Sequence, residues 1–299
     1  MGIDALRTPD ACFHDLPGFP YPPSYLEDLE GFEGLRMAFI DAGPPDGRPV
    51  LCLHGEPSWS YLYRKMIPVF AAAGMRVVVP DLYGFGRSDK PVNDAAYSFD
   101  FHRNSILRFI EKLKLDDITL VVQDWGGLLG LTIPVAMPDL IRRLLIMNTA
   151  FGTGTTPGEG FMAWRTYMAQ TPDLDIEALF RRAVPRLSPA EAAAYAAPWP
   201  AARYKAGVRM FPQLVPLTVQ DPGVSVSRAA AAWWASQWTG QSFMAVGIND
   251  PVLGPVVMGR IRGIIRGCPE PMLLDEGHFV PESGEQIARA ALRAWRSRH

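Results

Sequence analysis

The 299-residue chain is 48% hydrophobic and carries a formal net charge of −2 at pH 7. A chain of this size can bury a large core, and its near-neutral charge gives no field that would favour nucleic acid or an anionic membrane. Three widely spaced cysteines, Cys12, Cys52 and Cys268, argue against a disulfide framework and are typical of a reducing compartment. Apolar runs of signal-peptide or membrane-spanning length are lacking. We therefore expect a compact cytoplasmic protein.

The predicted elements alternate along the chain. Residues 1–33, rich in proline and aromatic side chains, predict an extended arm lying over the domain. Wholly apolar strands that alternate with helices are typical of a mostly parallel sheet with helices on both faces, an α/β fold. The expected strands are 35–40, 50–53, 76–81, 118–123, 144–148, 243–247 and 271–275, and the expected helices are 59–73, 99–115, 126–137 and 285–295.

The alternation stops after residue 150. Residues 151–220 contain prolines, alanine-rich helical pieces and many aromatic side chains, but no strand pattern. This composition predicts a helical cap of residues 151–220, inserted into one α/β core domain formed by residues 1–150 and 221–299.

A sharp turn is predicted after the strand at 118–123. The chain passes through Asp124 and Trp125 into two glycines and a helix, which resembles the nucleophile elbow of α/β-hydrolases, written G-x-S-x-G. Asp124 occupies the position of the serine, and Val122 replaces the first glycine. The alternative is an aspartate that only caps the following helix.

Polar residues follow three other strands, and all should meet at the carboxyl edge of the sheet. They are His54 and Glu56, then Asp250, then His278. The order Asp124, Asp250, His278 is that of nucleophile, acid and histidine in α/β-hydrolases. We expect His278 to act as general base, with Asp250 holding its tautomer. A turn residue before a proline is the alternative for Asp250, and His54 is expected to organise a loop.

A carboxylate nucleophile indicates the reaction type. Attack by Asp124 on a saturated carbon gives an ester that water can open, whereas a serine would give a stable ether. His278 would then deprotonate the water. The backbone N–H groups of Glu56 and Trp125 are expected to form the oxyanion hole.

The leaving group separates two substrate classes. A halide needs N–H donors in an apolar pocket, and the Trp125 indole supplies a donor without an acceptor. A second donor could come from Trp164 or Trp199, although core packing is the commoner fate of a tryptophan. An epoxide needs acidic O–H donors, and the expected cap offers three tyrosines, Tyr167, Tyr195 and Tyr204. A binding protein without catalysis is the third alternative.

Four segments together resemble the haloalkane dehalogenases, in particular the subfamily typified by the 1,2-dichloroethane enzyme. The resemblance implies an α/β-hydrolase fold and a triad of Asp124, Asp250 and His278, with Trp125 and a cap tryptophan as halide ligands. An aromatic residue three positions before the tryptophan matches Phe161, so the resemblance favours Trp164. The segments are His54–Arg64, Gly84–Pro91, Val122–Gly127 and Gly277–Phe279.

The resemblance also implies the ligands of the site. They are a small haloalkane, water and the halide ion, and neither a cofactor nor a metal is expected; we expect a monomer. The segment between Asn148 and Phe161 is shorter than in the type enzyme, which leaves pocket volume and substrate range open. Positions that line the family's pocket match Phe161, Phe211, Pro212, Val215, Val252 and Leu253.

Overall fold

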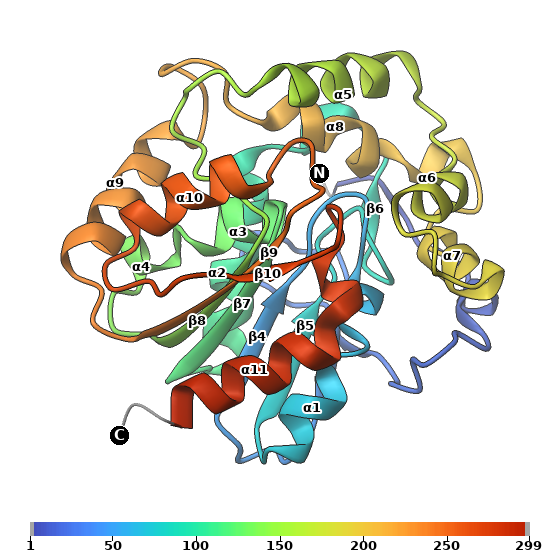
Figure 1. Ribbon diagram of the computed structural model, residues 1–299. Helices are drawn as coiled ribbons and strands as arrows, with labels where there is room; N and C mark the ends of the chain where they lie inside the picture. The colour runs from blue at the N-terminus through green and yellow to red at the C-terminus, as the bar shows by residue number, and fades with distance from the viewer. Residues whose placement is uncertain (1–2, 297–299) are drawn as a thin grey trace.

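The computed structural model describes residues 3–296. Residues 1–2 and 297–299, at the ends of the expected arm and core domain, lie outside the described residues. An eight-stranded sheet forms the centre, in the order β10-β9-β8-β7-β4-β5-β3-β2 (Figure 1). Neighbours from β10 to β5 are parallel, and β3 and β2 are antiparallel. The strands are β2 Ser24–Leu26, β3 Met37–Ala42, β4 Pro49–Leu53, β5 Arg76–Pro80, β7 Ile118–Gln123, β8 Ile141–Met147, β9 Gln241–Gly247 and β10 Met272–Leu274.

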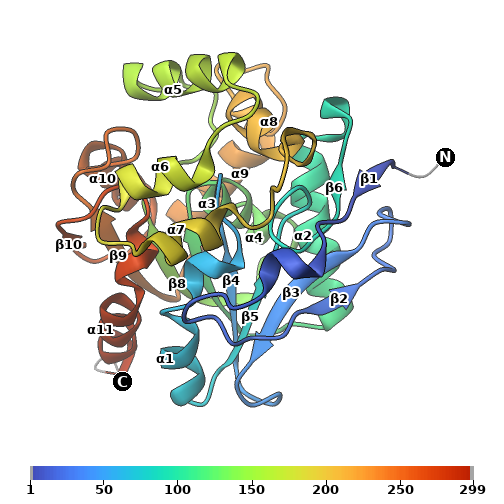
Figure 2. The ribbon, with the colours of Figure 1, turned by 90° about the vertical axis from the view of Figure 1, so that its right-hand side faces the viewer.

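Helices cover both faces of this sheet. On one face α1 and α11 pack together, while α2, α3, α4, α9 and α10 lie on the other (Figures 1 and 2). Because both faces are covered, every residue of β7 is buried. The predicted α/β architecture is confirmed. The helices are α1 Ile67–Ala72, α2 Phe99–Leu113, α3 Trp125–Gly130, α4 Ile133–Ala136, α9 Val224–Ser236, α10 Pro255–Ile264 and α11 Gly284–Arg296.

Two predicted helices are interrupted. The helix expected at 59–73 is a 3-10 turn, Ser60–Tyr63, followed by α1, and the helix expected at 126–137 is divided into α3 and α4. Both α1 and α4 have a proline in their first turn, where the missing N–H costs nothing. The same proline would break a longer helix.

The N-terminal segment is built into the fold more firmly than an overlying arm. Strand β1, Ala5–Leu6, pairs with β6, Lys90–Pro91, as a separate two-stranded sheet (Figure 2). Strand β2 pairs with β3 and forms an edge of the main sheet. The extended character is therefore as predicted, but part of the segment is a structural strand.

Four helices lie over the end of the sheet where the parallel strands finish (Figure 1). They pair as α5 with α8 and α6 with α7. No strand lies within residues 151–220 of the described chain, in agreement with the sequence pattern. These helices are α5 Glu159–Gln170, α6 Ile176–Ala183, α7 Pro189–Ala196 and α8 Ala206–Leu214.

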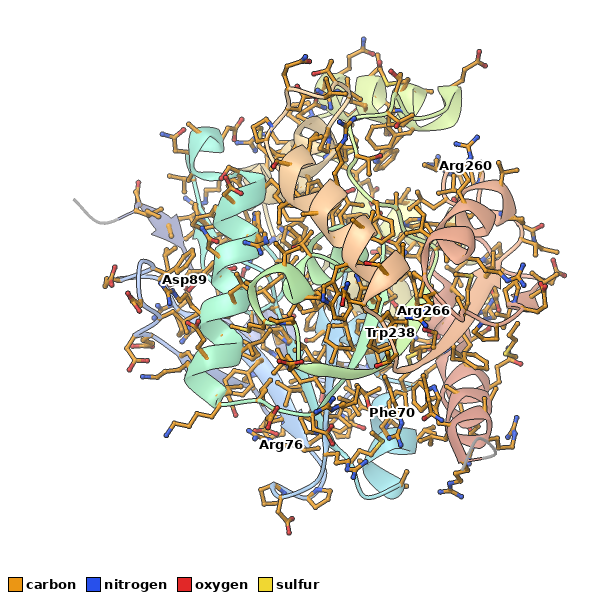
Figure 3. The ribbon with its side chains drawn as sticks, turned by 90° about the vertical axis from the view of Figure 1, so that its left-hand side faces the viewer. Phe70, Arg76, Asp89, Trp238, Arg260 and Arg266 are labelled. Carbon is orange, nitrogen blue, oxygen red and sulfur yellow. The ribbon has the colours of Figure 1, made fainter. Side chains whose placement is uncertain are left out.

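The core fills the space between sheet and helices. In Figure 3 the rings of Phe70 and Trp238 lie inside the molecule, and both are almost fully buried, whereas Arg260 lies at the surface. Within residues 3–296, no helix combines the length and the apolar character needed to cross a membrane.

Candidate active site

The turn after β7 is strained and closely packed. Asp124 has φ 52° and ψ −126°, a backbone conformation that residues other than glycine rarely adopt. The next helix, α3, lies so close to β4 that a Cβ atom at Gly126 would be 1.9 Å from the carbonyl oxygen of Leu53. The turn therefore has the geometry of a nucleophile elbow, with Asp124 at its apex.

Val122 is accommodated by a glycine on the opposite side of the contact. A Cβ atom at Gly130 of α3 would lie 2.9 Å from Cγ1 of Val122. The same Cβ atom would also lie 2.9 Å from Cδ1 of Leu53, so Gly130 leaves room for both side chains.

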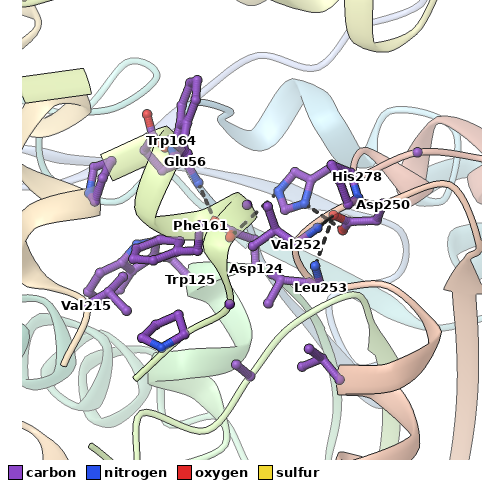
Figure 4. A pocket seen from close by; sticks show the side chains of 18 of the residues that line it. Glu56, Asp124, Trp125, Phe161, Trp164, Val215, Asp250, Val252, Leu253 and His278 are labelled. Atoms are coloured by element: carbon purple, nitrogen blue, oxygen red, sulfur yellow. Dashed lines mark hydrogen bonds and ion pairs between the residues drawn. The ribbon is translucent and has the colours of Figure 1, made fainter. Parts of the chain in front are cut away.

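The three predicted triad residues meet at the carboxyl edge of the sheet (Figure 4). Nδ1 of His278 lies 2.9 Å from Oδ2 of Asp250, and Nε2 lies 3.6 Å from Oδ2 of Asp124. Asp250 also accepts hydrogen bonds from the backbone N–H groups of Val252 and Leu253, at 2.9 and 3.0 Å. The turn that was the alternative role for Asp250 thus exists and orients the same carboxylate.

Charge pairing sets the ionisation of Asp250 and His278. Burial would raise the pKa of Asp250, but His278 and the two backbone donors outweigh it and hold that pKa below its usual range. Burial would lower the pKa of His278, but Asp250 and then Asp124 raise it to about 9. For Asp124, burial raises the pKa above its ordinary value, against the opposing effect of His278 and two backbone N–H groups.

Those two N–H groups belong to Glu56 and Trp125. The N–H of Glu56 donates to Oδ1 of Asp124 at 2.8 Å, and the N–H of Trp125 bonds the same carboxyl group. The contact from Glu56 holds Oδ1 and leaves Oδ2 on the side of His278. This is the arrangement that the sequence predicts for an oxyanion hole.

Two further polar residues join the network. Asn148 donates to Oδ2 of Asp250 at 3.0 Å and links it to the backbone of Gly247. Gln123, the last residue of β7, places its amide nitrogen 3.1 Å from both Nε2 and the carbonyl oxygen of His278. Sequence reasoning missed both residues, although each is a polar side chain at the carboxyl end of an apolar strand.

The Glu56 side chain forms another buried acidic group beside Asp124. Burial, and then repulsion from Asp124, raise the pKa of Glu56 well above its ordinary value, while a hydrogen bond from the Trp164 side chain opposes this. Oε1 of Glu56 is buried and has no hydrogen-bond partner. Glu56 therefore favours the neutral acid, and it connects the elbow to the Trp164 helix, α5 (Figure 4).

The triad opens into a cavity of about 1120 Å³ between the sheet and the covering helices. Ligand pockets usually range from roughly 300 to 1,000 Å³, so the room is ample. The segment after β8 forms part of the wall, which extends over residues 150–158. Five of the six expected wall residues line the cavity, namely Phe161, Pro212, Val215, Val252 and Leu253.

Phe211 is the sixth expected wall residue, and the prediction that it lines the pocket is wrong. Its ring is fully buried and packs against Trp125 and Phe85, with centroids 4.6 and 4.5 Å apart. The helix α8 turns Pro212 toward the cavity and Phe211 toward the core. Phe211 therefore supports the Trp125 ring from behind.

The tryptophans have different surroundings. Trp125 and Trp164 both line the cavity, and within residues 3–296 the Trp125 indole N–H has no hydrogen-bond partner. Trp199 instead donates its indole N–H to the carbonyl oxygen of Gly84 at 3.1 Å. Trp199 therefore has a structural hydrogen bond, whereas Trp125 and Trp164 line the cavity.

The expected cap tyrosines do not converge on the nucleophile. Tyr167 lines the cavity, whereas Tyr195 is fully buried and bonds Glu282, and Tyr204 packs in the core. His54 is also as predicted: its Nδ1 bonds the carbonyl oxygen of Gly55 at 2.9 Å, and Nε2 accepts from the N–H of Leu82 at 3.0 Å. Across the described part of the chain, no group of three or more His, Cys, Asp or Glu side chains could hold a metal ion.

Comparison with known proteins agrees with this geometry. The family model of the α/β-hydrolase fold matches residues 48–285. The haloalkane dehalogenase of Psychrobacter cryohalolentis is 43% identical, with 95% of each chain covered, and that of Mycobacterium marinum is 42% identical, covering 96% of this chain and 98% of the relative.

A solved structure is similar along the whole chain. It is the haloalkane dehalogenase of Paraglaciecola agarilytica, described as tetrameric, with 49% identity, a TM-score of 0.96, and 98% of this chain and 99% of that one covered. Identity above 40% over almost the full length places the chain firmly within one family. The chain belongs to the haloalkane dehalogenases, which are hydrolases of the α/β-hydrolase fold that act on carbon–halide bonds.

Proposed function

We propose that the protein hydrolyses haloalkanes to an alcohol, a halide ion and a proton, through a covalent alkyl ester on Asp124. One observation carries the proposal: a carboxylate stands at the apex of a strained elbow that lines the cavity, with Oδ1 held by the backbone N–H of Glu56 and Oδ2 on the side of His278. Oδ2 is the attacking atom. In-line attack forms the C–O bond as the C–halogen bond breaks, and the electron pair leaves with the halide.

The departing halide is held by Trp125 and Trp164. An indole is a donor without an acceptor, so it favours an anion and does not compete with the carboxylate. The Trp125 N–H has no protein partner among residues 3–296 and is ready to bind. The Trp164 indole bonds Glu56, so halide binding has to share or displace that contact.

Water then opens the ester. His278 takes a proton from the water, the hydroxide attacks the Asp124 carbonyl carbon, and the developing oxyanion is held by the N–H groups of Glu56 and Trp125. The intermediate then collapses: the bond between that carbon and the alkyl oxygen breaks, and the alcohol leaves with the proton held by His278. The new carboxyl group releases its proton to solvent, so Asp124 returns as a carboxylate. Ester formation removes the negative charge of Asp124, one of the two charges that raise the pKa of His278. Alkylation therefore lowers the pKa of His278, so that more of the ring is neutral and able to accept a proton at the moment it is needed.

Intact mass spectrometry of a His278→Ala variant tests this mechanism. After exposure to a reactive bromoalkane, we expect a mass increase equal to one alkyl group, because the ester forms and cannot be opened. A His278→Ala/Asp124→Ala double variant should show no increase. An unmodified His278→Ala chain that has nonetheless released halide would contradict the covalent mechanism.

Epoxide hydrolysis is the weaker alternative. It relied on paired tyrosines, and of Tyr167, Tyr195 and Tyr204 only Tyr167 lines the cavity. Turnover of a bromoalkane against a small epoxide of equal carbon number separates the two activities. A non-catalytic binding role would require that no halide be released from a broad panel of haloalkanes.

The organisation of the chain completes the proposal. We assign residues 151–220 to a cap domain and residues 1–150 and 221–299 to the core, because α5 to α8 cover the site and pair with each other. The odd number of cysteines, all free, supports a cytoplasmic location.

The assembly needs its own measurement. The sequence predicts a monomer, whereas the relative from Paraglaciecola agarilytica is described as tetrameric. Light scattering on the purified protein decides between them, and a mass of four chains would make the monomer prediction wrong.

A further inference from the structure

The Gln123 side chain has a hydrogen-bond pattern that fixes its orientation. It is buried at the end of β7, and its amide nitrogen lies 3.1 Å from the backbone carbonyl oxygen of His278. A carbonyl oxygen only accepts, so the group that faces it must be the NH₂ of the amide. Rotating the amide by half a turn would place two oxygens against each other.

The same NH₂ group also faces the imidazole ring. It lies 3.1 Å from Nε2 of His278, while Nδ1 lies 2.9 Å from Oδ2 of Asp250. An NH₂ group donates and a carboxylate accepts, so the two contacts fit a ring with a lone pair on Nε2 and a proton on Nδ1. A proton on Nε2 would stand against the amide protons of Gln123.

We propose that Gln123 is a positioning residue for ester hydrolysis: once Asp124 is esterified, it favours His278 as a neutral base that carries its proton on Nδ1 and keeps its Nε2 lone pair for the water. The inference deepens the proposed function and rests on it. Gln123 acts from the strand that carries the nucleophile, so base and nucleophile are aligned by one element.

The charged groups around the ring act in the opposite direction. Asp250, from the loop after β9, and Asp124, from the elbow, both favour the imidazolium. Glu276, two residues before His278, is tied to Arg186 and Ser283 instead. Gln123 is the neutral group that favours the free base, and Oε1 of its amide is buried without a partner, so the imidazolium has no acceptor there unless the amide rotates.

Rapid-quench kinetics of Gln123→Met test the inference, because methionine keeps the volume but loses the donor. Halide release in the first turnover should stay within about twofold of wild type, since alkylation does not use His278. Ester hydrolysis at pH 7 should slow by about tenfold, with its acid limb displaced upward by about one pH unit, which corresponds to a factor of ten. Gln123→Glu, which offers the imidazolium an acceptor, should displace the limb further.

Gln241→Met is the matched control. Gln241 lies at the opposite end of the sheet, half-buried, where its amide bonds the backbone of Trp295. Its replacement should change neither step. Equal slowing of alkylation and hydrolysis in Gln123→Met, or an unchanged acid limb in both Gln123 variants, would overturn the inference. Failure of the proposed function appears separately, as the absence of an ester in His278→Ala.

A second measurement needs no variant. In wild-type protein with ¹⁵N-labelled histidine, the His278 resonances at pH 10.5, above the raised pKa of about 9, should show a neutral ring protonated on Nδ1. An imidazolium, or a ring protonated on Nε2, at that pH would overturn the inference even if the Gln123 variants do not fold.

Discussion

The strand ends and the helices above them form the two walls of one cavity, but they are built differently. All six residues of α3, behind the elbow, are buried, whereas Met168 is the only buried residue among the twelve of α5. Gln123, His278, Asp250 and Asn148 are joined by hydrogen bonds, while Trp164 contacts Tyr167 at a centroid distance of 5.9 Å near the surface. We infer that bond making depends on the densely packed strand ends, which also supply Trp125 to the halide, and that the remaining leaving-group and substrate contacts come from the more loosely packed helices.

The largest effect is expected from Asp250→Asn. Every neighbour of this carboxylate donates to it, so an amide would lose the charge and place an NH₂ group against other donors. Ester hydrolysis should fall by about 10³- to 10⁴-fold, the scale seen when the acid of a triad is made an amide. Alkylation should change much less, and rapid-quench mass spectrometry measures both steps.

Asp275→Asn provides the control for that experiment. Asp275 is exposed, lies near the same end of the sheet and bonds Asn249. Its replacement should leave both steps unchanged. If replacement of Asp250 impaired alkylation as severely as hydrolysis, Asp250 would not act specifically in ester hydrolysis.

A smaller effect is expected from Trp164→Phe on the helical wall. The variant loses one hydrogen bond to an anion, worth roughly 1.5 to 3 kcal/mol, so halide should bind about 10- to 100-fold more weakly. Titration with bromide, followed by tryptophan fluorescence, measures the affinity. Hydrolysis of a preformed ester should be unaffected if the helical wall takes no part in that step.

Trp199→Phe is the matched replacement. It removes a buried hydrogen bond to Gly84 and should lower the free energy of unfolding by about 1 kcal/mol, with no change in halide affinity. Weaker bromide binding in Trp199→Phe than in Trp164→Phe would contradict the assignment of Trp164 as a halide ligand.

The smallest effect is expected from Glu56→Gln, at the contact between the walls. The pKa of Glu56 is raised in the folded protein, so its stabilising contribution is complete below the ordinary value of 4.5 and is lost as pH rises through the raised value. Glutamine stays neutral and keeps an acceptor for Trp164. The melting temperature of the variant, relative to that of wild type, should therefore increase as pH rises. The variant should also stay active to a higher pH than wild type.

A pH series of thermal melts and turnover checks the Glu56 prediction. Identical pH dependence in both proteins would mean that Glu56 does not ionise in this range. If the melting temperature of the variant rose relative to wild type only below pH 4.5, the pKa of Glu56 would be lowered on folding and not raised.

The triad could be predicted because each member stands in a recognisable local sequence pattern. Asp124 stands where strand gives way to glycine and helix, and His278 and Asp250 follow strands in a fixed order along the chain. Gln123 could not be assigned in this way, because it lies 155 positions from His278, and Asn148 lies 102 positions from Asp250. A polar residue at the end of an apolar strand indicates a site, but the sequence does not show which distant residue it will hydrogen-bond.

The sequence alone determined the fold class and the reaction type and predicted the order of the proposed triad residues, since periodicity, turn chemistry and the choice of a carboxylate are local properties. Tertiary structure decided which of Trp164 and Trp199 keeps a donor for a ligand, that Phe211 faces the core, and that Gly130 makes room for Val122. These outcomes depend on which side of each helix meets the sheet. Packing between segments distant in sequence fixes that side.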